Sequence, residues 1–261
     1  MEATLDGILL GVVQGLTEFL PVSSSGHLVI AQHVLNSSIA SGILFEVCLH
    51  IATLVAIVLF YRKRVAGLAL GALRGEAAAW RYAGKLALAT LPAVVVALFA
   101  RHLIEEQFDS LGAVGICLLL TGCIVWSTRY SNRGEGLEEP GWGAALLIGL
   151  AQAAAILPGI SRSGSTVAAG MALGLKPLAA AEFSFLLGII AIAGAGFLMV
   201  PELGSLSDSA MEAILAGGLA ALISGLVALW AFVWLLRSQR FHLFAWYAWS
   251  VGAATLLVSL Q

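Results

Sequence analysis

The chain has 261 residues, of which 60% are hydrophobic and only 11% are charged. Soluble globular domains carry about 25% charged residues, so this composition excludes a soluble domain and indicates a polytopic membrane protein. The formal net charge of −2 and the lack of a basic patch give no support to a nucleic-acid partner.

The first predicted element is an interrupted apolar segment over residues 5–36. It does not resemble a signal peptide, because no basic region precedes the apolar run and acidic residues interrupt it. Its centre carries a proline followed by serines and a glycine, a combination that breaks a helix. The stretch reads Gly11-Val-Val-Gln14-Gly-Leu-Thr-Glu18-Phe-Leu-Pro21-Val-Ser23-Ser24-Ser25-Gly26-His27.

Uninterrupted apolar stretches follow, each near the roughly 20 residues that a helix needs to cross a bilayer. Three of them cover about residues 43–60, 86–100 and 111–127. A second interrupted segment then occupies residues 141–177. Three more spans cover 179–200, 213–236 and 243–260, so the sequence predicts six transmembrane helices.

The second interrupted segment repeats the first at a constant offset of 138 residues, as Gln14 and Gln152 illustrate, and only the proline is shifted by one position. It reads Gly149-Leu-Ala-Gln152-Ala-Ala-Ala-Ile-Leu-Pro158-Gly-Ile-Ser161-Arg162-Ser163-Gly164. Broken helices at corresponding places in two halves commonly mark a binding site at the bilayer midplane. Non-helical backbone is tolerated at that depth only where it is buried or lines a wet cavity. Both segments are therefore predicted to be re-entrant helical hairpins.

The loop charges predict the orientation. Basic residues gather in the loops at about 62–85, 129–133 and 237–240, which we expect in the cytoplasm, whereas the loops at 101–110 and 201–212 are mainly acidic. Six spans and two non-crossing hairpins satisfy this pattern. The single membrane domain, 1–261, then divides into repeat one (about 5–127) and repeat two (about 141–260) in inverted topology. We expect the hairpin tips to meet, an arrangement typical of transporters.

The tips carry the chemistry of an anion site. Serines precede the second half-helix of each hairpin, and serine is a favoured N-terminal cap. Two helix N-termini offer free N–H groups to a phosphate, and the fork of Arg162 suits phosphate oxygens. The alternative is that the serines are only caps and that Arg162 is only the charge partner of Glu18, which would leave His27 without a role.

A hydroxyl, a histidine and a carboxylate close together are the parts of an activated nucleophile. Ser24, His27 and Glu18 supply them. A carboxylate beside phosphate oxygens repels them unless a divalent cation bridges the two, so Glu18 is also a candidate ligand for Mg²⁺ or Ca²⁺. Glu46 and His50 lie four residues apart on one helix face, and either line the same cavity or form a structural pair.

The two motifs together, with Ala-Glu-Phe-Ser-Phe-Leu-Leu after the second, resemble the BacA-type undecaprenyl-diphosphate phosphatases over essentially the whole chain. The resemblance implies an enzyme that removes the terminal phosphate of undecaprenyl diphosphate, recycles the lipid carrier of cell-wall synthesis and confers bacitracin resistance. The first position of the family motif is often Glu and is Gln14 here, which removes one charged metal ligand.

Carried over residue by residue, the resemblance implies that Glu18, Ser24, His27 and Arg162 are catalytic. We count as substrate-binding residues Gln14, Ser23, Ser25, Gly26, Ser161, Ser163 and Thr166.

The expected location is the plasma membrane of a bacterium, with the site facing the extracytoplasmic side. The alternative function is a transporter or flippase for a phosphorylated polyprenyl lipid. The sequence leaves open whether Ser24, Ser25 or His27 attacks, and whether two copies form a homodimer.

Overall fold

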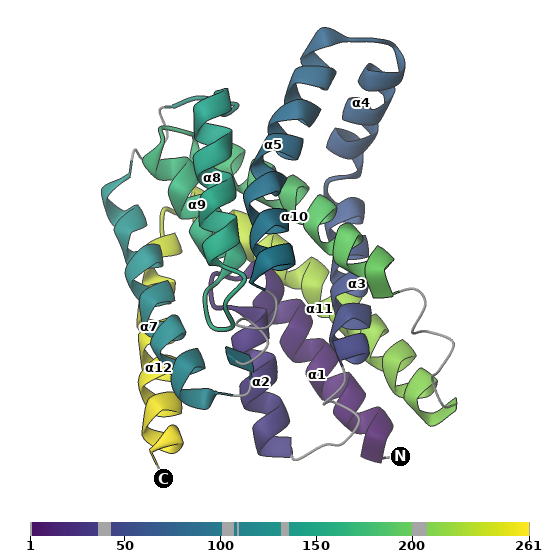
Figure 1. The fold of residues 1–261 in the computed structure, drawn as a ribbon, viewed down its shortest axis with the longest axis vertical. Helices are drawn as coiled ribbons and strands as arrows, with labels where there is room; N and C mark the ends of the chain where they lie inside the picture. The colour runs from purple at the N-terminus through teal and green to yellow at the C-terminus, as the bar shows by residue number, and fades with distance from the viewer. Residues whose placement is uncertain are drawn as a thin grey trace.

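The computed structural model describes residues 2–35, 43–100, 107–108, 110–131, 136–199 and 208–260. Over these residues the protein is an all-α bundle, as predicted, with eleven α-helices (Figure 1). The first six are α1 (Glu2–Phe19), α2 (Ser24–Leu35), α3 (Ile43–Phe60), α4 (Arg62–Leu73), α5 (Ala77–Phe99) and α7 (Leu111–Ser127). The others are α8 (Trp142–Ala154), α9 (Arg162–Ala172), α10 (Pro177–Met199), α11 (Asp208–Arg237) and α12 (Phe244–Ser259).

Five stretches of the described chain are long and apolar enough to cross a membrane, and they lie in or around α5, α7, α10, α11 and α12. A sixth candidate arises if α3 and α4, which are bent by 79° relative to each other, form one span. These helices coincide with the predicted spans. The prediction of a multi-pass membrane protein is therefore confirmed.

One expectation was wrong. The basic segment after the first span is not a loop but the helix α4 and the first turns of α5. Lysine, arginine, alanine and leucine are all good helix formers, so this segment stays helical although it is charged. The six basic residues concerned are Arg62, Lys63, Arg64, Arg74, Arg81 and Lys85.

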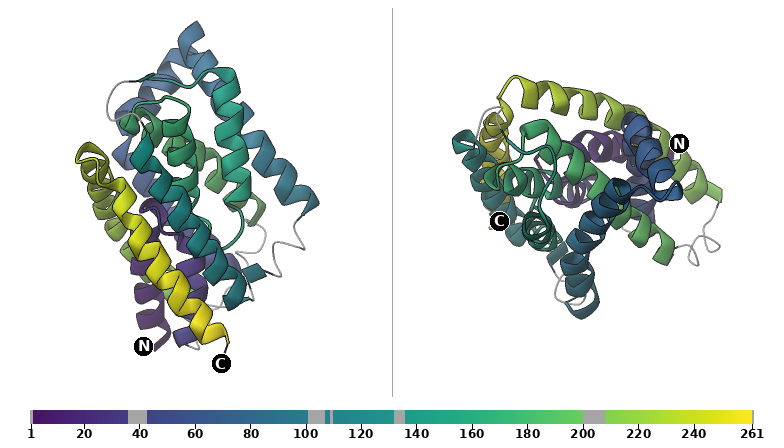
Figure 2. Two further views of the ribbon diagram at one scale, coloured as in Figure 1. Left: turned by 90° about the vertical axis from the view of Figure 1, so that its left-hand side faces the viewer. Right: turned by 90° about the horizontal axis from the view of Figure 1, so that it is seen from above.

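Two helical hairpins occupy the interrupted segments. The first consists of α1 and α2, and the second of α8 and α9. The helices α2, α8 and α9 have 12, 13 and 11 residues, fewer than the roughly 20 that a complete crossing needs. The two chain ends lie at the same end of the bundle (Figures 1 and 2).

Each hairpin packs against a helix from the other half of the chain. Helix α1 lies along α11, and α8 lies along α5, while α7 pairs with α12 (Figure 2, left). Glycines make the first contact close, since a Cβ atom at Gly11 would lie only 2.1 Å from the carbonyl oxygen of Gly217. Without a hydrophobic effect between helices in lipid, such close backbone packing is a main source of helix association.

A buried aromatic chain anchors the inner end of α1. The ring of Phe185 in α10 contacts Phe19 at 5.7 Å and Phe232 of α11 at 5.0 Å between centroids. Because Phe19 directly follows Glu18, this packing also fixes the place of that carboxylate.

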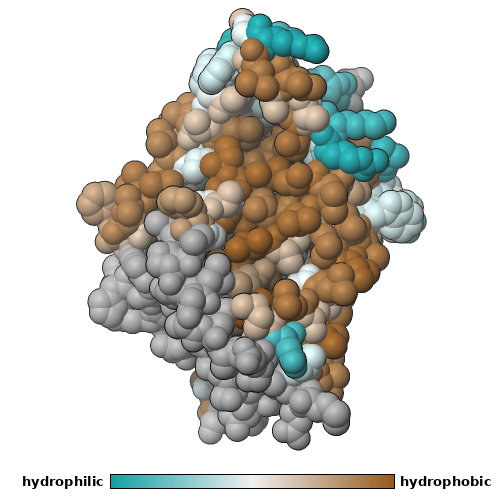
Figure 3. Space-filling model, turned by 90° about the vertical axis from the view of Figure 1, so that its right-hand side faces the viewer, coloured by the Kyte–Doolittle hydropathy of each residue, from teal (hydrophilic) through white to brown (hydrophobic). Residues whose placement is uncertain are grey.

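The outside of the bundle is apolar, as a lipid-facing surface requires. Figure 3 shows one face on which hydrophobic side chains cover the middle and hydrophilic ones gather toward one end. The most exposed large apolar side chains include Phe99 at 86% and Phe197 at 79%. A surface of this kind would be unstable in water and is expected in a bilayer.

Candidate active site

The tip of the first hairpin is a strained turn between Phe19 and Ser24. Ser23 has a φ angle of +68°, a left-handed conformation that is uncommon for residues other than glycine. Its hydroxyl oxygen accepts hydrogen bonds from the backbone N–H groups of Gly26 (3.3 Å) and Gly159 (3.1 Å). The second bond crosses to the other hairpin, so Ser23 ties the two tips together.

The second tip is held by Thr121 of α7. The Thr121 hydroxyl donates to the carbonyl of Gly159 (2.7 Å) and accepts from the N–H of Ser161 (2.9 Å). Ser161 caps α9, because its Oγ accepts from the N–H of Gly164 at 3.1 Å. Ser163 donates to the carbonyl of Leu20 in the first tip (3.2 Å). The predicted meeting of the two tips is confirmed.

Glu18 is the centre of the site, and its side chain is almost completely buried. Its Oε2 accepts hydrogen bonds from Ser24 Oγ (2.5 Å) and Gln14 Nε2 (3.0 Å). Its Oε1 accepts from Nη2 of Arg162 (2.7 Å). His50 Nε2 lies 3.4 Å from Oε2. One carboxylate thus joins a serine of the first hairpin and the arginine of the second.

Glu18, Ser24, Arg162 and His50 line a cavity of about 350 Å³. Its polar lining comprises Thr17, Glu18, Ser23, Ser24, Ser25, Glu46, His50, Ser161 and Arg162. Its apolar lining comprises Val47, Phe108, Ala155, Ile156, Ile160, Ala191, Ile192 and Ala195. A cavity with both polar and apolar lining residues fits an amphiphilic ligand.

Of the two alternatives for Glu46 and His50, the structure supports the first, because both line the cavity. His50 Nδ1 contacts the carbonyl oxygen of Glu46 (2.8 Å), which orients the ring with Nε2 toward Glu18. Gln32 donates to Glu46 Oε1 at 2.9 Å. The contact of Gln32 with Glu46 was not predicted, since a glutamine in the second half-helix carries no distinctive sequence signal.

His27 lies elsewhere. Its Nδ1 contacts the carbonyl oxygen of Ser23 (2.8 Å), and its Nε2 contacts the hydroxyl of Tyr247 in α12 (2.9 Å). It does not line the cavity, and its ring nitrogens bond to groups other than Ser24. The expected placement of His27 within reach of Ser24 is therefore not found.

Thr166 and Ser163 are also outside the cavity lining. Thr166 is 1% exposed and donates to the carbonyl of Arg162 (2.7 Å), while its Oγ1 lies 2.5 Å from Ser184 Oγ of α10. Both residues brace the half-helix that carries Arg162. Gln14 is fully buried behind Glu18, and Gly26 packs against Gly159.

The donor set fits a divalent cation only together with phosphate. Within the described ranges, no three His, Cys, Asp or Glu side chains group closely enough to hold a metal ion. Magnesium at phosphate sites is usually held by one or two carboxylates plus the phosphates themselves. Glu18 supplies one carboxylate, and the buried Oε1 of Gln14 has no hydrogen-bond partner in the part of the chain that the structure describes. A carbonyl oxygen of this kind is a suitable additional ligand.

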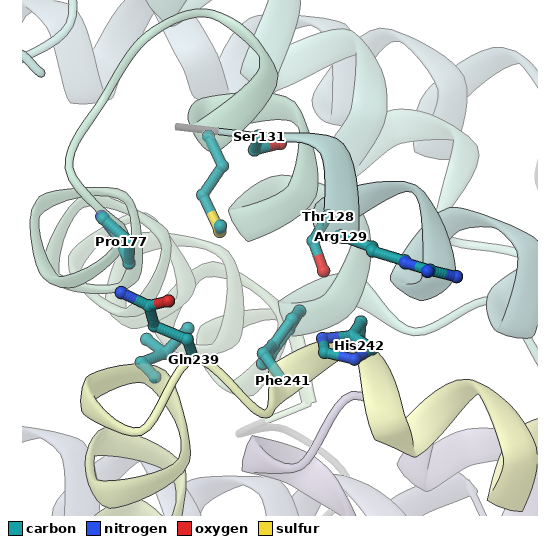
Figure 4. Close-up of a pocket in the computed structure, with 9 residues that line it drawn as sticks. Thr128, Arg129, Ser131, Pro177, Gln239, Phe241 and His242 are labelled. Atoms are coloured by element: carbon teal, nitrogen blue, oxygen red, sulfur yellow. The ribbon is translucent and has the colours of Figure 1, made fainter. Parts of the chain in front are cut away.

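A second, smaller cavity of about 30 Å³ lies between the ends of α7, α9, α10 and α11 (Figure 4). Arg129, His242 and Gln239 are among the residues that line it, and none of the predicted site residues does. A volume of this size holds about two water molecules, so it is too small for a lipid headgroup.

Glu182 is distant from the cavity lining and pairs with Arg64 of α4. Arg64 Nε donates to Glu182 Oε1 at 2.8 Å, and its guanidinium lies 4.6 Å from the ring centroid of Tyr82. This ion pair joins α10 to α4.

Comparisons with known proteins identify the family of the chain. The family described as "Bacitracin resistance protein BacA" matches residues 7–254. An undecaprenyl-diphosphatase of Desulforapulum autotrophicum is 38% identical, with 96% of both chains covered. Proteins of the same name from Desulfosudis oleivorans and Acinetobacter baumannii are 38% and 32% identical over 98% of this chain, and over 99% and 96% of their own. The chain therefore belongs to the BacA family.

Proposed function

We propose that this protein hydrolyses undecaprenyl diphosphate to undecaprenyl phosphate and inorganic phosphate, and so recycles the lipid carrier of cell-wall synthesis. Full-length relatives that carry the name undecaprenyl-diphosphatase support this function. The structural observation that carries it is the hydrogen-bonded group Ser24–Glu18–Arg162 at the junction of two helix N-termini. That group combines a nucleophile, a base and a phosphate-binding cation.

Ser24 is assigned as the nucleophile because its hydroxyl already donates to Glu18 at 2.5 Å. Glu18 takes the hydroxyl proton while Ser24 Oγ attacks the terminal phosphorus. The bond between that phosphorus and the bridging oxygen breaks, Glu18 passes its proton to the leaving oxygen and becomes a carboxylate again, and undecaprenyl phosphate leaves. Water then attacks the phosphoserine with Glu18 as its base, which releases inorganic phosphate and restores the hydroxyl.

Arg162 is assigned as the clamp for the phosphate in the transition state. Its Nη2 bonds to Glu18, whereas its Nη1 is buried without a hydrogen-bond partner among the described residues. The N–H groups at the starts of α2 and α9 add further donors. Preorganised donors of this type stabilise the developing charge of the transferred group.

A divalent cation, Mg²⁺ or Ca²⁺, would be held by Glu18 and the substrate phosphates, with Gln14 as a neutral ligand. When bound, it would neutralise the charge of the diphosphate. The undecaprenyl chain would lie against the apolar lining of the cavity, which includes Ile156, Ile160 and Ile192.

The proposed topology has six spans, two re-entrant hairpins and inverted repeats over about 5–127 and 141–260, with the cavity open to the extracytoplasmic side. The reciprocal packing supports the repeats: α1 of the first half lies on α11 of the second, and α8 of the second lies on α5 of the first. The pairs α3–α10 and α7–α12 also join corresponding helices.

The same reciprocal packing supports the second candidate, a flippase or transporter of a phosphorylated polyprenyl lipid. Phosphate release separates the two functions. We expect purified protein in detergent with Mg²⁺ to release phosphate from undecaprenyl diphosphate, and the Ser24→Ala variant to release none. If the wild-type protein released no phosphate yet moved the lipid between leaflets of proteoliposomes, the transporter would replace the enzyme.

A further inference from the structure

The hydrogen bonds of His27 fix the state of its ring. A carbonyl oxygen can only accept, so the contact between Nδ1 and the Ser23 carbonyl places a proton on Nδ1. In a neutral ring, Nε2 is then the acceptor, and the hydroxyl of Tyr247 donates to it across 2.9 Å. The two rings also stack, with centroids 5.6 Å apart and planes 9° from parallel.

The ring of His27 restrains the strained turn. The Ser23 carbonyl accepts from Nδ1 of His27 and also from the backbone N–H of His27 (3.2 Å). A left-handed serine persists only where its surroundings hold it. Ser23 directly precedes Ser24, whose hydroxyl reaches Glu18. The conformation of Ser23 therefore decides where Ser24 points.

We propose that Tyr247 is a positioning residue for the reaction. Its hydrogen bond keeps the His27 ring oriented and protonated on Nδ1, and this ring in turn holds the turn that keeps the Ser24 hydroxyl hydrogen-bonded to Glu18. This inference rests on the proposed function for its activity readout only. Tyr247 is 220 positions from His27 and belongs to α12, a helix that contributes no residue to the lining of the active-site cavity.

The surroundings of Tyr247 strengthen this bond. Tyr247 lies in an apolar span and is 46% exposed. A hydroxyl within an apolar span is costly to leave unbonded. Its hydrogen bond to His27 is therefore favoured.

The second hairpin is fastened in a parallel way. Thr121 of α7 bonds to both Gly159 and Ser161 at the second tip. Helices α7 and α12 pack together, so one helix pair holds both tips: α7 through Thr121 and α12 through Tyr247.

The experiment uses Tyr247→Phe, which removes one oxygen and keeps the ring. We expect kcat for undecaprenyl diphosphate to fall about three- to tenfold, the value of one hydrogen bond, while KM changes little. Tyr130→Phe is the matched control, because Tyr130 is 79% exposed and remote from the cavity, and its activity should stay at the wild-type level.

A double-mutant cycle shows whether Tyr247 acts through His27. With His27→Ala already present, Tyr247→Phe should have no further effect, because residues that act as a unit are not additive. The cycle is measured on kcat and on the thermal midpoint of unfolding. The coupling between the two residues can then be determined even if the His27→Ala enzyme turns over slowly. Additive effects, or a Tyr247→Phe enzyme equal to Tyr130→Phe, would overturn the proposal.

Nitrogen NMR of ¹⁵N-histidine-labelled protein tests the ring state without any activity. The chain has five histidines, and the signal lost in His27→Ala identifies His27. We expect its Nε2 signal to shift in Tyr247→Phe and not in Tyr130→Phe. An unchanged signal would refute the positioning role. Inactive wild-type protein with the expected shift would instead count against the phosphatase function alone.

Discussion

Nη2 of Arg162 donates a hydrogen bond to Oε1 of Glu18 at 2.7 Å, and the two residues are 144 positions apart in the chain. The pair connects the first half-helix of one hairpin with the second half-helix of the other. Each charge would be costly to bury alone, and each offsets the burial of the other. The same pair explains why the chain keeps both charges in an otherwise apolar interior.

The first prediction concerns Arg162. Arg162→Lys should keep less than about a third of the wild-type rate of phosphate release, since loss of one such donor typically costs 10²–10³ in rate. An ammonium group carries the charge but cannot use two nitrogens at once. Arg129→Lys, which changes an exposed arginine outside the active-site cavity, is the control. If Arg162→Lys kept more than about a third of the wild-type turnover, Arg162 would not be the residue that clamps the phosphate.

The second prediction concerns the cation and Glu18. Activity should disappear on thorough chelation and return with Mg²⁺ or Ca²⁺, and Glu18→Gln should be nearly inactive. Gln14→Glu should be tolerated and should lower the cation concentration needed for half-maximal activity, because it adds a charged oxygen beside Glu18. Full activity of chelated protein would exclude the metal and leave Glu18 as a proton carrier.

The third prediction identifies the nucleophile. Ser24→Ala should abolish hydrolysis but not binding of a prenyl diphosphate, whereas Ser25→Ala should be mild. Ser23→Ala should lower the free energy of unfolding by about 1–3 kcal/mol, since the Ser23 hydroxyl satisfies two buried N–H groups. If the Ser24→Ala enzyme kept substantial turnover, the nucleophile would have to be His27, Ser25 or water and not Ser24.

The fourth prediction concerns topology. A single cysteine at Arg74, on a background without the three native cysteines, should react with a membrane-impermeant reagent only from the cytoplasmic side. The companion positions Ser37 and Ser205 should react from outside, and Asn132 from the cytoplasm. These three lie outside the described residues. Labelling of Arg74 and Asn132 from outside would refute the inverted topology.

The fifth prediction tests the contact between α1 and α11. Gly11→Val should lower the thermal midpoint strongly and reduce activity, because its Cβ would meet the Gly217 carbonyl oxygen at 2.1 Å. The backbone cannot yield as a side chain can, and overpacking typically costs 1–3 kcal/mol or more. Gly143→Val in α8 is the control, since nothing lies within 4 Å of its Cβ position. Equal midpoints for the two variants would contradict close packing.

The hairpins and the meeting of their tips were predictable because the same motif occurs twice in the sequence. The repeated Gln, Pro, Ser and Gly positions mark equivalent breaks, and a buried Arg162 requires a partner such as Glu18. The BacA resemblance is confirmed by the family match over residues 7–254. Long repeated motifs are informative because they constrain two places at once.

The contacts of single side chains were less predictable. The sequence predicts His27 close to Ser24, yet the His27 ring bonds to Tyr247, a residue from the last helix. A tyrosine in an apolar span has no sequence feature that indicates such a partner. The sequence predicts a loop for the charged segment after the first span, because charge alone does not distinguish an exposed helix such as α4 from a loop.

The position of α1 against α11 has a consequence for how the protein is made. The ribosome synthesises the first hairpin early, but the helix that covers it, Asp208–Arg237, and the arginine that pairs with Glu18 emerge much later. Until Arg162 has been synthesised, a Glu18 carboxylate inside the membrane would have no positively charged partner. This favours keeping the first hairpin in the insertion machinery or at the lipid surface. The pair of Glu18 and Arg162 can therefore form only after the second hairpin has been synthesised.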